Sequence, residues 1–181
     1  MARVPLITSK DQIAPEHHAT ADAIIGSRGA LSGPFQVFLH SPEIAGRIAH
    51  LGTLVRFEGT LDFRVRVLAA MVVAREFDAL YVWGAQTGGA RRQNVLETTI
   101  DAIRENRNDG VPAEDLMIVE YTRTLLRKHR IPADMDKAMR DRFGNDQMIQ
   151  LTGAIGYYSL LSMTVNANEM EAGPGMEVLK V

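Results

Sequence analysis

Residues 61–86 read LDFRVRVLAAMVVAREFDALYVWGAQ and say more about the architecture than any other part of the chain. Apolar side chains fill the stretch from Val65 to Ala74 on every side of the expected helix. A surface helix cannot be apolar all round, so this element is expected in the centre of the fold or of a subunit interface. The run lacks two-residue alternation and is rich in alanine between Ala69 and Ala79, which favours a helix over a strand.

The end of this segment, YVWGAQ, places Val82 and Gln86 four residues apart. On a helix this spacing puts the two side chains one above the other, and we expect both to face one pocket. Gly88 and Gly89 follow, although each glycine in a helix interior costs roughly 1 kcal/mol relative to alanine. The glycine pair therefore predicts that another part of the structure approaches the backbone closely there.

Start and stop signals for helices follow one another along the rest of the chain, with little evidence for strands. Ser41 and Pro42 read as an N-cap and a first helical residue, and Gly144 reads as a helix end. Helices are expected over residues 15–30, 42 to between 56 and 59, 94–104, 112–129, 132–143 and 145–168. The prediction is one all-α, helical-bundle domain over residues 1–168, followed by an extended tail over residues 169–181 that has the option of docking on a neighbouring subunit.

The charge and the apolar pattern exclude several classes of partner. The chain of 181 residues has 20 basic and 22 acidic side chains, so no global field draws it to nucleic acid or to anionic lipid. The longest apolar run, residues 149–165, is interrupted by polar side chains and falls short of the ~20 residues of a membrane span. The N-terminus lacks the pattern of a signal peptide. We expect a cytoplasmic protein without a nucleic-acid or membrane partner.

The sequence contains no cysteine. This absence excludes a disulfide framework, a thiolate metal site and a thiol peroxidase cycle, whose nucleophile is a thiolate. His17, His18 and His129 have no partners at metal-ligand spacing. No metal site and no cofactor are predicted.

Three segments together resemble the carboxymuconolactone decarboxylase and alkylhydroperoxidase D-like superfamily. The first is the order Arg-x-Arg at Arg64 and Arg66, an Ala/Val-rich helix, a turn and Tyr-x-Trp at 81–83. The others are FLHSPEIAGRIAHLGTLVRFEGTL, residues 38–61, and GYYSLLSMTVNANEM, residues 156–170, which are similar to the preceding and the closing helix of the decarboxylase-like branch. The resemblance implies an all-α fold of the alkylhydroperoxidase D-like type. It also implies a small-molecule substrate and a homo-oligomer, a trimer or a trimer of dimers.

The chain departs from this family at the residues that carry its chemistry. Relatives usually have Glu where this sequence has Val82 and His where it has Gln86, and they commonly have Glu at the position of Val67. The redox branch has Cys-x-x-Cys, which here is Ala79 and Val82. Gln86 cannot titrate, although its amide can donate a hydrogen bond to a carbonyl oxygen or an oxyanion. An unchanged decarboxylase mechanism is therefore not expected.

His40, Tyr81 and Gln86 are the candidate catalytic residues. The resemblance places His40 near the family's cavity, and a neutral imidazole can act as an acid or a base at physiological pH. The alternative for His40 is a local hydrogen bond to the backbone where its helix begins. Tyr81 is the second candidate to move a proton, and Gln86 the candidate to hold charge on an oxygen.

Arg56, Val82, Trp83, Arg64 and Glu76 are the candidate substrate-binding residues. Either arginine can bind a carboxylate through two hydrogen bonds, or it forms a structural ion pair with a nearby acid. Val82 shapes an apolar wall, and Trp83 either lines a planar ligand or packs in the core. Glu76 is the only acid close in sequence that can replace the missing carboxylate, and a solvated or ion-paired role is the alternative.

Three functions from different classes remain open. The first is a cofactor-free lyase, isomerase or hydrolase acting on a small lactone or an unsaturated or aromatic-derived carboxylic acid by proton transfer in an apolar pocket. The second is a non-catalytic protein that binds a small ligand and has lost the Glu and His of its relatives. The third is a structural oligomer whose cavity is filled by side chains such as Trp83. The first is preferred because of the resemblance, although a fold hosts many reactions and the site decides which one.

Overall fold

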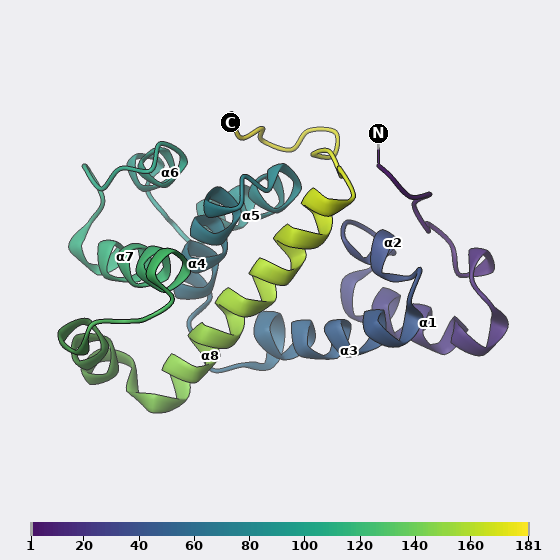
Figure 1. The fold of residues 1–181 in the computed structure, drawn as a ribbon, viewed down its shortest axis with the longest axis horizontal. Coiled ribbons are helices and arrows are strands. Elements are labelled where there is room, and N and C mark those ends of the chain that lie inside the picture. The colour runs from purple at the N-terminus through teal and green to yellow at the C-terminus, as the bar shows by residue number, and fades with distance from the viewer. Residues whose placement is uncertain (1, 181) are drawn as a thin grey trace.

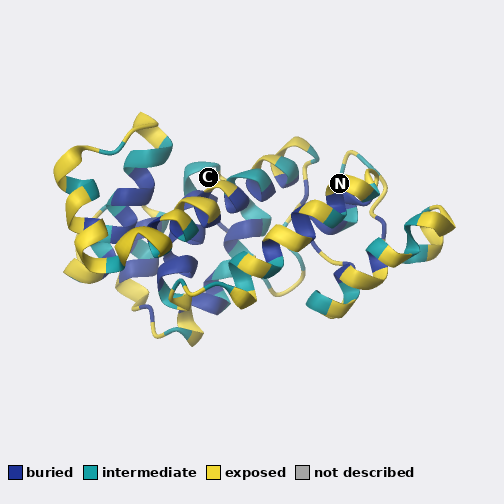
Figure 2. Cartoon of the chain, turned by 90° about the horizontal axis from the view of Figure 1, so that it is seen from below, coloured by how far each residue is buried: buried dark blue, intermediate teal, exposed yellow. Residues whose placement is uncertain are grey.

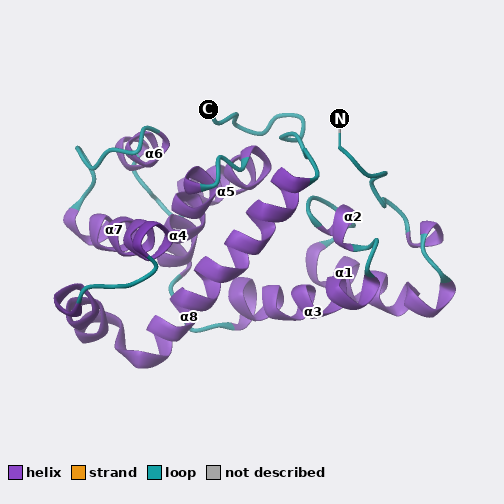
Figure 3. Ribbon diagram, in the orientation of Figure 1, coloured by secondary structure: helices purple, strands orange, loops and turns teal. Residues whose placement is uncertain are grey.

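The computed structural model describes residues 2–180, and over this range the chain is helical and without strands (Figures 1 and 3). Short 3₁₀ turns, η1 and η2, cover Lys10–Gln12 and Pro15–His17, and a π-helical segment, η3, covers Leu54–Glu58. The α-helices are α1 His18–Arg28, α2 Phe35–Phe38, α3 Pro42–Thr53, α4 Phe63–Glu76, α5 Leu80–Arg92, α6 Glu97–Arg104, α7 Ala113–Lys128 and α8 Ala133–Ala167. This confirms the predicted all-α fold.

Helix α4 is the centre of the bundle. Every residue from Val65 to Ala74 is buried, and α5, α7 and α8 all pack against this helix. The helix starts at Asp62, whose carboxylate accepts hydrogen bonds from the backbone N–H groups of Arg64 and Val65. The apolar residues on all sides of this helix predicted a position in the centre of the fold or of an interface. The central position is confirmed, because other helices of the same chain cover it. In Figure 2 the buried residues accordingly lie along the inward faces of the packed helices.

The long helix α8 crosses the molecule and lies between α4 and α5 on one side and the N-terminal helices α1 to α3 on the other (Figure 1). It is kinked at Gly144, whose φ of 72° and ψ of 170° are not helical. The sequence predicted a helix end at this glycine, and the two parts of α8 on either side of the kink correspond to the two expected helices. Ser41 precedes α3 as predicted, but its side chain makes no capping hydrogen bond. Pro42 and Glu43 nevertheless stand in the first turn as expected.

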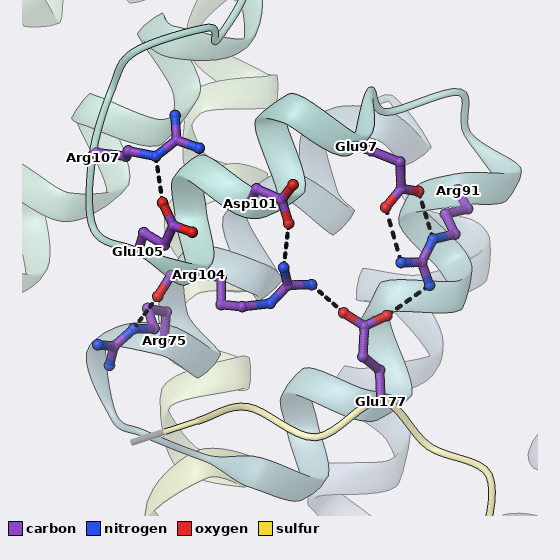
Figure 4. Close-up of polar contacts among 8 residues, drawn as sticks. All are labelled: Arg75, Arg91, Glu97, Asp101, Arg104, Glu105, Arg107 and Glu177. Carbon is purple, nitrogen blue, oxygen red and sulfur yellow. Dashed lines mark hydrogen bonds and ion pairs between the residues drawn. The ribbon is translucent and has the colours of Figure 1, made fainter.

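Residues 169–180 have no regular structure but pack on helices of their own chain. Met170 and Leu179 are buried. The carboxylate of Glu177 bridges Arg91 of α5 and Arg104 of α6, and Figure 4 shows it between these two guanidinium groups. The tail therefore fastens α5 to α6 within one protomer, where the sequence had also left open a contact with a neighbouring subunit.

The close approach to the backbone of α5 is at Gly84. A Cβ atom there would lie 2.8 Å from Met176 Cβ and 2.9 Å from the backbone oxygen of Glu177. At Gly88 and Gly89, where the sequence predicted it, the nearest heavy atom would be at 3.5 Å, an ordinary contact. The expected segment exists, but it crosses the helix one turn earlier than the glycine pair suggested.

No helix in the range 2–180 combines the length and the hydropathy needed to cross a membrane.

Gly84→Ala is expected to release the tail from α5, because backbone and side chain of the tail occupy the space of the new methyl group. Gly88→Ala on the same helix is the matched control, and it should stabilise the protein by up to about 1 kcal/mol through helix propensity alone. Hydrogen exchange of the amides of residues 170–180 measures the difference. Equal protection of these amides in both variants would show that Gly84 does not govern docking of the tail.

Candidate functional site

A cavity of about 200 Å³ opens where the loop after α1 meets α5 and α8. The loop contributes Ser32, Gly33 and Pro34, with Arg28 and Phe35 on either side of it. The π-helical segment contributes Arg56, and the remaining lining residues are Tyr81, Val82, Ala85 and Gln86 from α5 and Tyr157, Tyr158 and Leu161 from α8. Four elements far apart in sequence thus enclose one small space.

Helix α5 presents Val82 and Gln86 to this cavity on one face, as their spacing predicted. Val82 is buried and Gln86 is half-buried. Trp83 of the same helix lies outside the lining and is fully buried, and the Thr87 hydroxyl donates to the Trp83 carbonyl at 2.8 Å within the helix. The cavity therefore has an apolar wall at Val82 and an amide donor one turn further along.

Two arginines line the cavity and no aspartate or glutamate does. Arg28 donates to the Ala49 carbonyl at 2.9 Å and lies 4.3 Å from the centre of the Phe35 ring, and its Nε is buried without a hydrogen-bond partner. Arg56 lies over the Phe57 ring at 4.8 Å. Neither arginine forms an ion pair with a carboxylate among residues 2–180. The site is thus positively charged and suited to an anion.

Three phenols supply further donors. Burial raises the pKa of Tyr81, and burial also raises the pKa of Tyr157, although a hydrogen bond with Arg28 opposes that shift. Both phenols therefore keep their protons at neutral pH. Tyr158 packs edge-on against Tyr157 with ring centres 5.3 Å apart, and its hydroxyl accepts a 2.7 Å hydrogen bond from Arg66.

The structure brings together Arg56, Tyr81, Val82 and Gln86 of the predicted site residues. Their roles in binding and catalysis stay predictions. His40 does not line the cavity: it is exposed, and its Nε2 lies 2.8 Å from the carbonyl oxygen of Pro5. This contact is to the backbone, as in the alternative from the sequence, but to a segment 35 residues away and not to the start of its own helix.

Arg64, Glu76 and Trp83 also lie outside the lining. Arg64 binds buried Asp115 through two hydrogen bonds of 2.7 and 3.1 Å and so fixes α4 to α7. Glu76 is paired with Arg127 at 2.5 and 2.7 Å. Trp83 is fully buried beneath the guanidinium of Arg104. Structural contacts thus occupy all three side chains, and Arg64 and Glu76 each form an ion pair, which is the alternative that the sequence left open for both.

Sequence reasoning missed Arg28, Tyr157, Tyr158 and the residue behind the last of these, Arg66. The two tyrosines lie on the closing helix, and nothing in a single sequence shows that α8 crosses α5 at this level. Arg28 is the last residue of α1 and precedes the start of α5 by about 50 residues, and no pattern in the sequence joins the two. Arg66 was visible as the second arginine of Arg-x-Arg, but its burial appears only with the fold.

A larger cleft of about 400 Å³ lies at the α6–α7 end of the molecule. It is also rich in arginine, but those side chains are already engaged: Arg127 binds Glu76, and Arg123 donates to the Asn108 side chain and to the carbonyl of Arg107. Burial lowers the pKa of Arg123. The N–H groups of Arg123 are bonded to oxygens of residues 107 and 108, which follow α6. The smaller cavity is therefore the better candidate for a ligand site. Across residues 2–180 no three His, Asp or Glu side chains gather where they could hold a metal ion.

No protein-family model matches the sequence, and no curated protein matches it. Solved structures do share its fold. A peroxidase-related protein from Ralstonia eutropha with an alkylhydroperoxidase AhpD core aligns with a TM-score of 0.76 at 13% identity, over 96% of this chain and 93% of that one. A peroxidase-related protein from Silicibacter sp. gives 0.74 at 12% identity, over 97% and 95%.

A third structure is a cysteine-to-alanine variant of the debrominase Bmp8 in complex with 2,3,4-tribromopyrrole, with a TM-score of 0.73 at 13% identity, over 96% and 95% of the two chains. At such low identity these likenesses show the fold alone. The chain has the alkylhydroperoxidase D-like fold that its sequence resemblance implied.

Gly33→Ala is expected to narrow the cavity and to destabilise the fold. A Cβ atom at Gly33 would lie 2.6 Å from the Tyr81 hydroxyl, and its φ of 60° disfavours a side chain. Gly29→Ala is the matched control: its φ of 83° carries a similar backbone cost of roughly 1–2 kcal/mol, but nothing lies within 4 Å of the new atom. Chemical denaturation should show the larger loss for Gly33→Ala. Equal losses would mean that Tyr81 moves aside freely.

Proposed function

We propose that this protein is a cofactor-free lyase of the decarboxylase type that acts on a small lactone or an unsaturated or aromatic-derived carboxylic acid. The observation that carries the proposal is a small cavity lined by two arginines, phenols and an amide, with no acidic side chain in the lining. Such a lining attracts an acid and offers hydrogen-bond donors to an oxygen that gains negative charge. Isomerisation or hydrolysis of the same class of acid needs the same features.

The reaction can be written with these side chains alone. Arg56 binds a carboxylate that remains in the product, and the carbon–carbon bond to a second carboxylate breaks with release of carbon dioxide. The electron pair of that bond moves into the conjugated system and places negative charge on a carbonyl oxygen, to which Gln86 donates a hydrogen bond. Tyr81 then delivers a proton to carbon, and water returns a proton to its phenolate.

The complex of a protein with the same fold supports the proposal that the ligand is planar. The debrominase Bmp8 was solved with 2,3,4-tribromopyrrole, a small flat ring. The variant in that complex replaces a cysteine, and the present sequence contains none, so we do not propose the thiol chemistry available to relatives that have cysteine.

A specific observation favours a second function, the binding of a small acid without turnover. The cavity has no histidine and no carboxylate in its lining, and burial raises the pKa values of Tyr81 and Tyr157. Phenols of raised pKa give up a proton less readily, whereas their capacity to donate hydrogen bonds is retained.

A screen of lactones and unsaturated acids for changes in ultraviolet absorbance tests the proposal. Once a substrate is found, Arg56→Met should raise KM by about 10- to 100-fold, the range expected for a lost hydrogen bond to a charged group. Arg47→Met, at an exposed position on α3 outside the lining, is the matched control and should leave KM unchanged. Binding of such acids without any product would favour the second function.

The same assay decides between the two candidate proton carriers. Tyr81 lines the cavity, whereas His40 bonds to the backbone outside it. We expect Tyr81→Phe to lower kcat by about 10²- to 10⁴-fold, as for the loss of a general acid, and His40→Ala to leave kcat within about twofold. The reverse result would return the proton transfer to His40.

We further propose that the protein is a homo-oligomer. Leu54, Phe57 and Phe63 are 48%, 53% and 43% exposed, and Ile149 of α8 is 68% exposed. Leu54 and Phe57 precede the loop 59–62 and Phe63 follows it, while Ile149 is next to Gln150, whose side-chain oxygen accepts a hydrogen bond from the Leu61 N–H at 3.0 Å. Apolar side chains grouped in this way mark an interface. Sedimentation should show an oligomer at micromolar concentration that Phe57→Asp dissociates, and a wild-type monomer at that concentration would contradict the proposal.

A further inference from the structure

Arg66 is a buried cation without a counter-ion. It lies on α4, is 4% exposed and forms no ion pair with a carboxylate among residues 2–180. Its guanidinium is 3.9 Å from the centre of the Phe63 ring, and one of its nitrogens donates to Tyr158 Oη at 2.7 Å. Arg64, two residues earlier, has Asp115 as its partner. Burying a charge without an ionic partner is costly, so the exception at Arg66 calls for a reason.

The hydrogen bond between Arg66 and Tyr158 fixes the direction of the phenol hydrogen. A guanidinium only donates, so the oxygen of Tyr158 must accept this bond and keeps its own hydrogen for another acceptor. No protein acceptor for that hydrogen is found in residues 2–180. Tyr158 is 1% exposed, and it lines the cavity between α5 and α8. The phenol hydrogen therefore has no acceptor among the described residues, on a side chain that lines the cavity.

We propose that Tyr158, backed by Arg66, is the oxyanion site of this cavity. It binds a planar ligand whose oxygen carries a full or a developing negative charge, an enolate or a phenolate. Tyr158 Oη donates a hydrogen bond to that oxygen, and the guanidinium of Arg66 lies directly behind the phenol and offsets the charge. The inference rests on the proposed function, and it adds two residues to a role for which the sequence had suggested Gln86.

The arrangement suits a charge that forms during a reaction. A donor that is already held in place and shielded from water needs no reorganisation when the charge appears, and the attraction is stronger than it would be in water. Tyr158 packs edge-on against Tyr157, with an angle of 77° between the rings, so the phenol has little freedom to turn away. Arg66 acts through Tyr158 and is a positioning residue.

A purely structural role accounts for less of the geometry. The Phe63 ring and the phenol oxygen give Arg66 favourable contacts, but neither carries a full negative charge. A structural pair would also leave the phenol hydrogen buried without an acceptor, which itself costs free energy. An anionic ligand supplies both the missing charge and the missing acceptor.

The first test needs no substrate and uses 4-nitrophenolate at pH 9 as the probe, with binding followed by its visible absorbance. Tyr158→Phe should weaken binding of the probe by about 10- to 100-fold. Tyr121→Phe removes the hydroxyl of another buried tyrosine that lies on α7 outside the lining, and it should leave the affinity unchanged. The neutral ether 4-nitroanisole should bind equally to wild type and to Tyr158→Phe.

Two arginine variants separate charge from packing. Arg66→Lys should retain more affinity for 4-nitrophenolate than Arg66→Gln, while 4-nitroanisole should not distinguish them. If Tyr158→Phe does not fold, as judged by circular dichroism, the double variant Arg66→Met/Tyr158→Phe removes the unpaired charge as well and should show the same loss for the phenolate alone. Unchanged phenolate affinity in the folded variant, or no binding of 4-nitrophenolate to wild type, would overturn the inference.

Turnover provides the second test on any substrate found in the screen. Tyr158→Phe should lower kcat by about 10²- to 10³-fold with KM changed by less than about threefold, as for the loss of an oxyanion donor. Full turnover by this variant would overturn the inference and leave the proposed function standing. If binding of the probe depends on Tyr158 but the protein turns over no acid, the inference stands and the proposed function is wrong.

Discussion

Helix α4 must be kept from water on all sides, and the rest of the structure follows from this constraint. Its residues from Val65 to Ala74 are buried, and burial of such side chains supplies the main driving force for folding. Helices α5, α7 and α8 are the cover. Because α5 and α8 are both drawn onto the same helix, their side chains are brought to opposite walls of one space. The cavity is a consequence of how the central helix is wrapped.

The two arginines at the start of α4 show how one local pattern serves two purposes. Arg64 and Arg66 differ by two positions and therefore point to different sides of the helix. Arg64 turns towards α7 and the end of α5, where Asp115 and the carbonyls of Gln93 and Asn94 accept four hydrogen bonds from it. Arg66 points towards α8 and donates a hydrogen bond to the hydroxyl of Tyr158. One arginine fixes the bundle, and the other brings a positive charge behind the wall of the cavity.

Much of the fold was predictable, because helix periodicity, caps and glycines are local signals. The central position of 65–74, the break at Gly144 and the common face of Val82 and Gln86 all follow from a few neighbouring residues. The site was predictable only on α5 and at Arg56. Arg28, Tyr157 and Tyr158 join it through packing between distant helices, which a single sequence does not reveal. The same limit applies to Glu76 and Arg64, whose ion-pair partners lie 51 positions away in sequence.

The tail also links distant parts of the chain, and this has a practical consequence. Residues 176 and 177 lie against Gly84, and Glu177 bonds to Arg91 on the same helix and to Arg104 on the next. Gly84 lies between Val82 and Gln86, two of the four cavity residues of that helix. A purification tag fused to the carboxyl end would therefore be joined to a segment that packs on the helix forming one wall of the pocket.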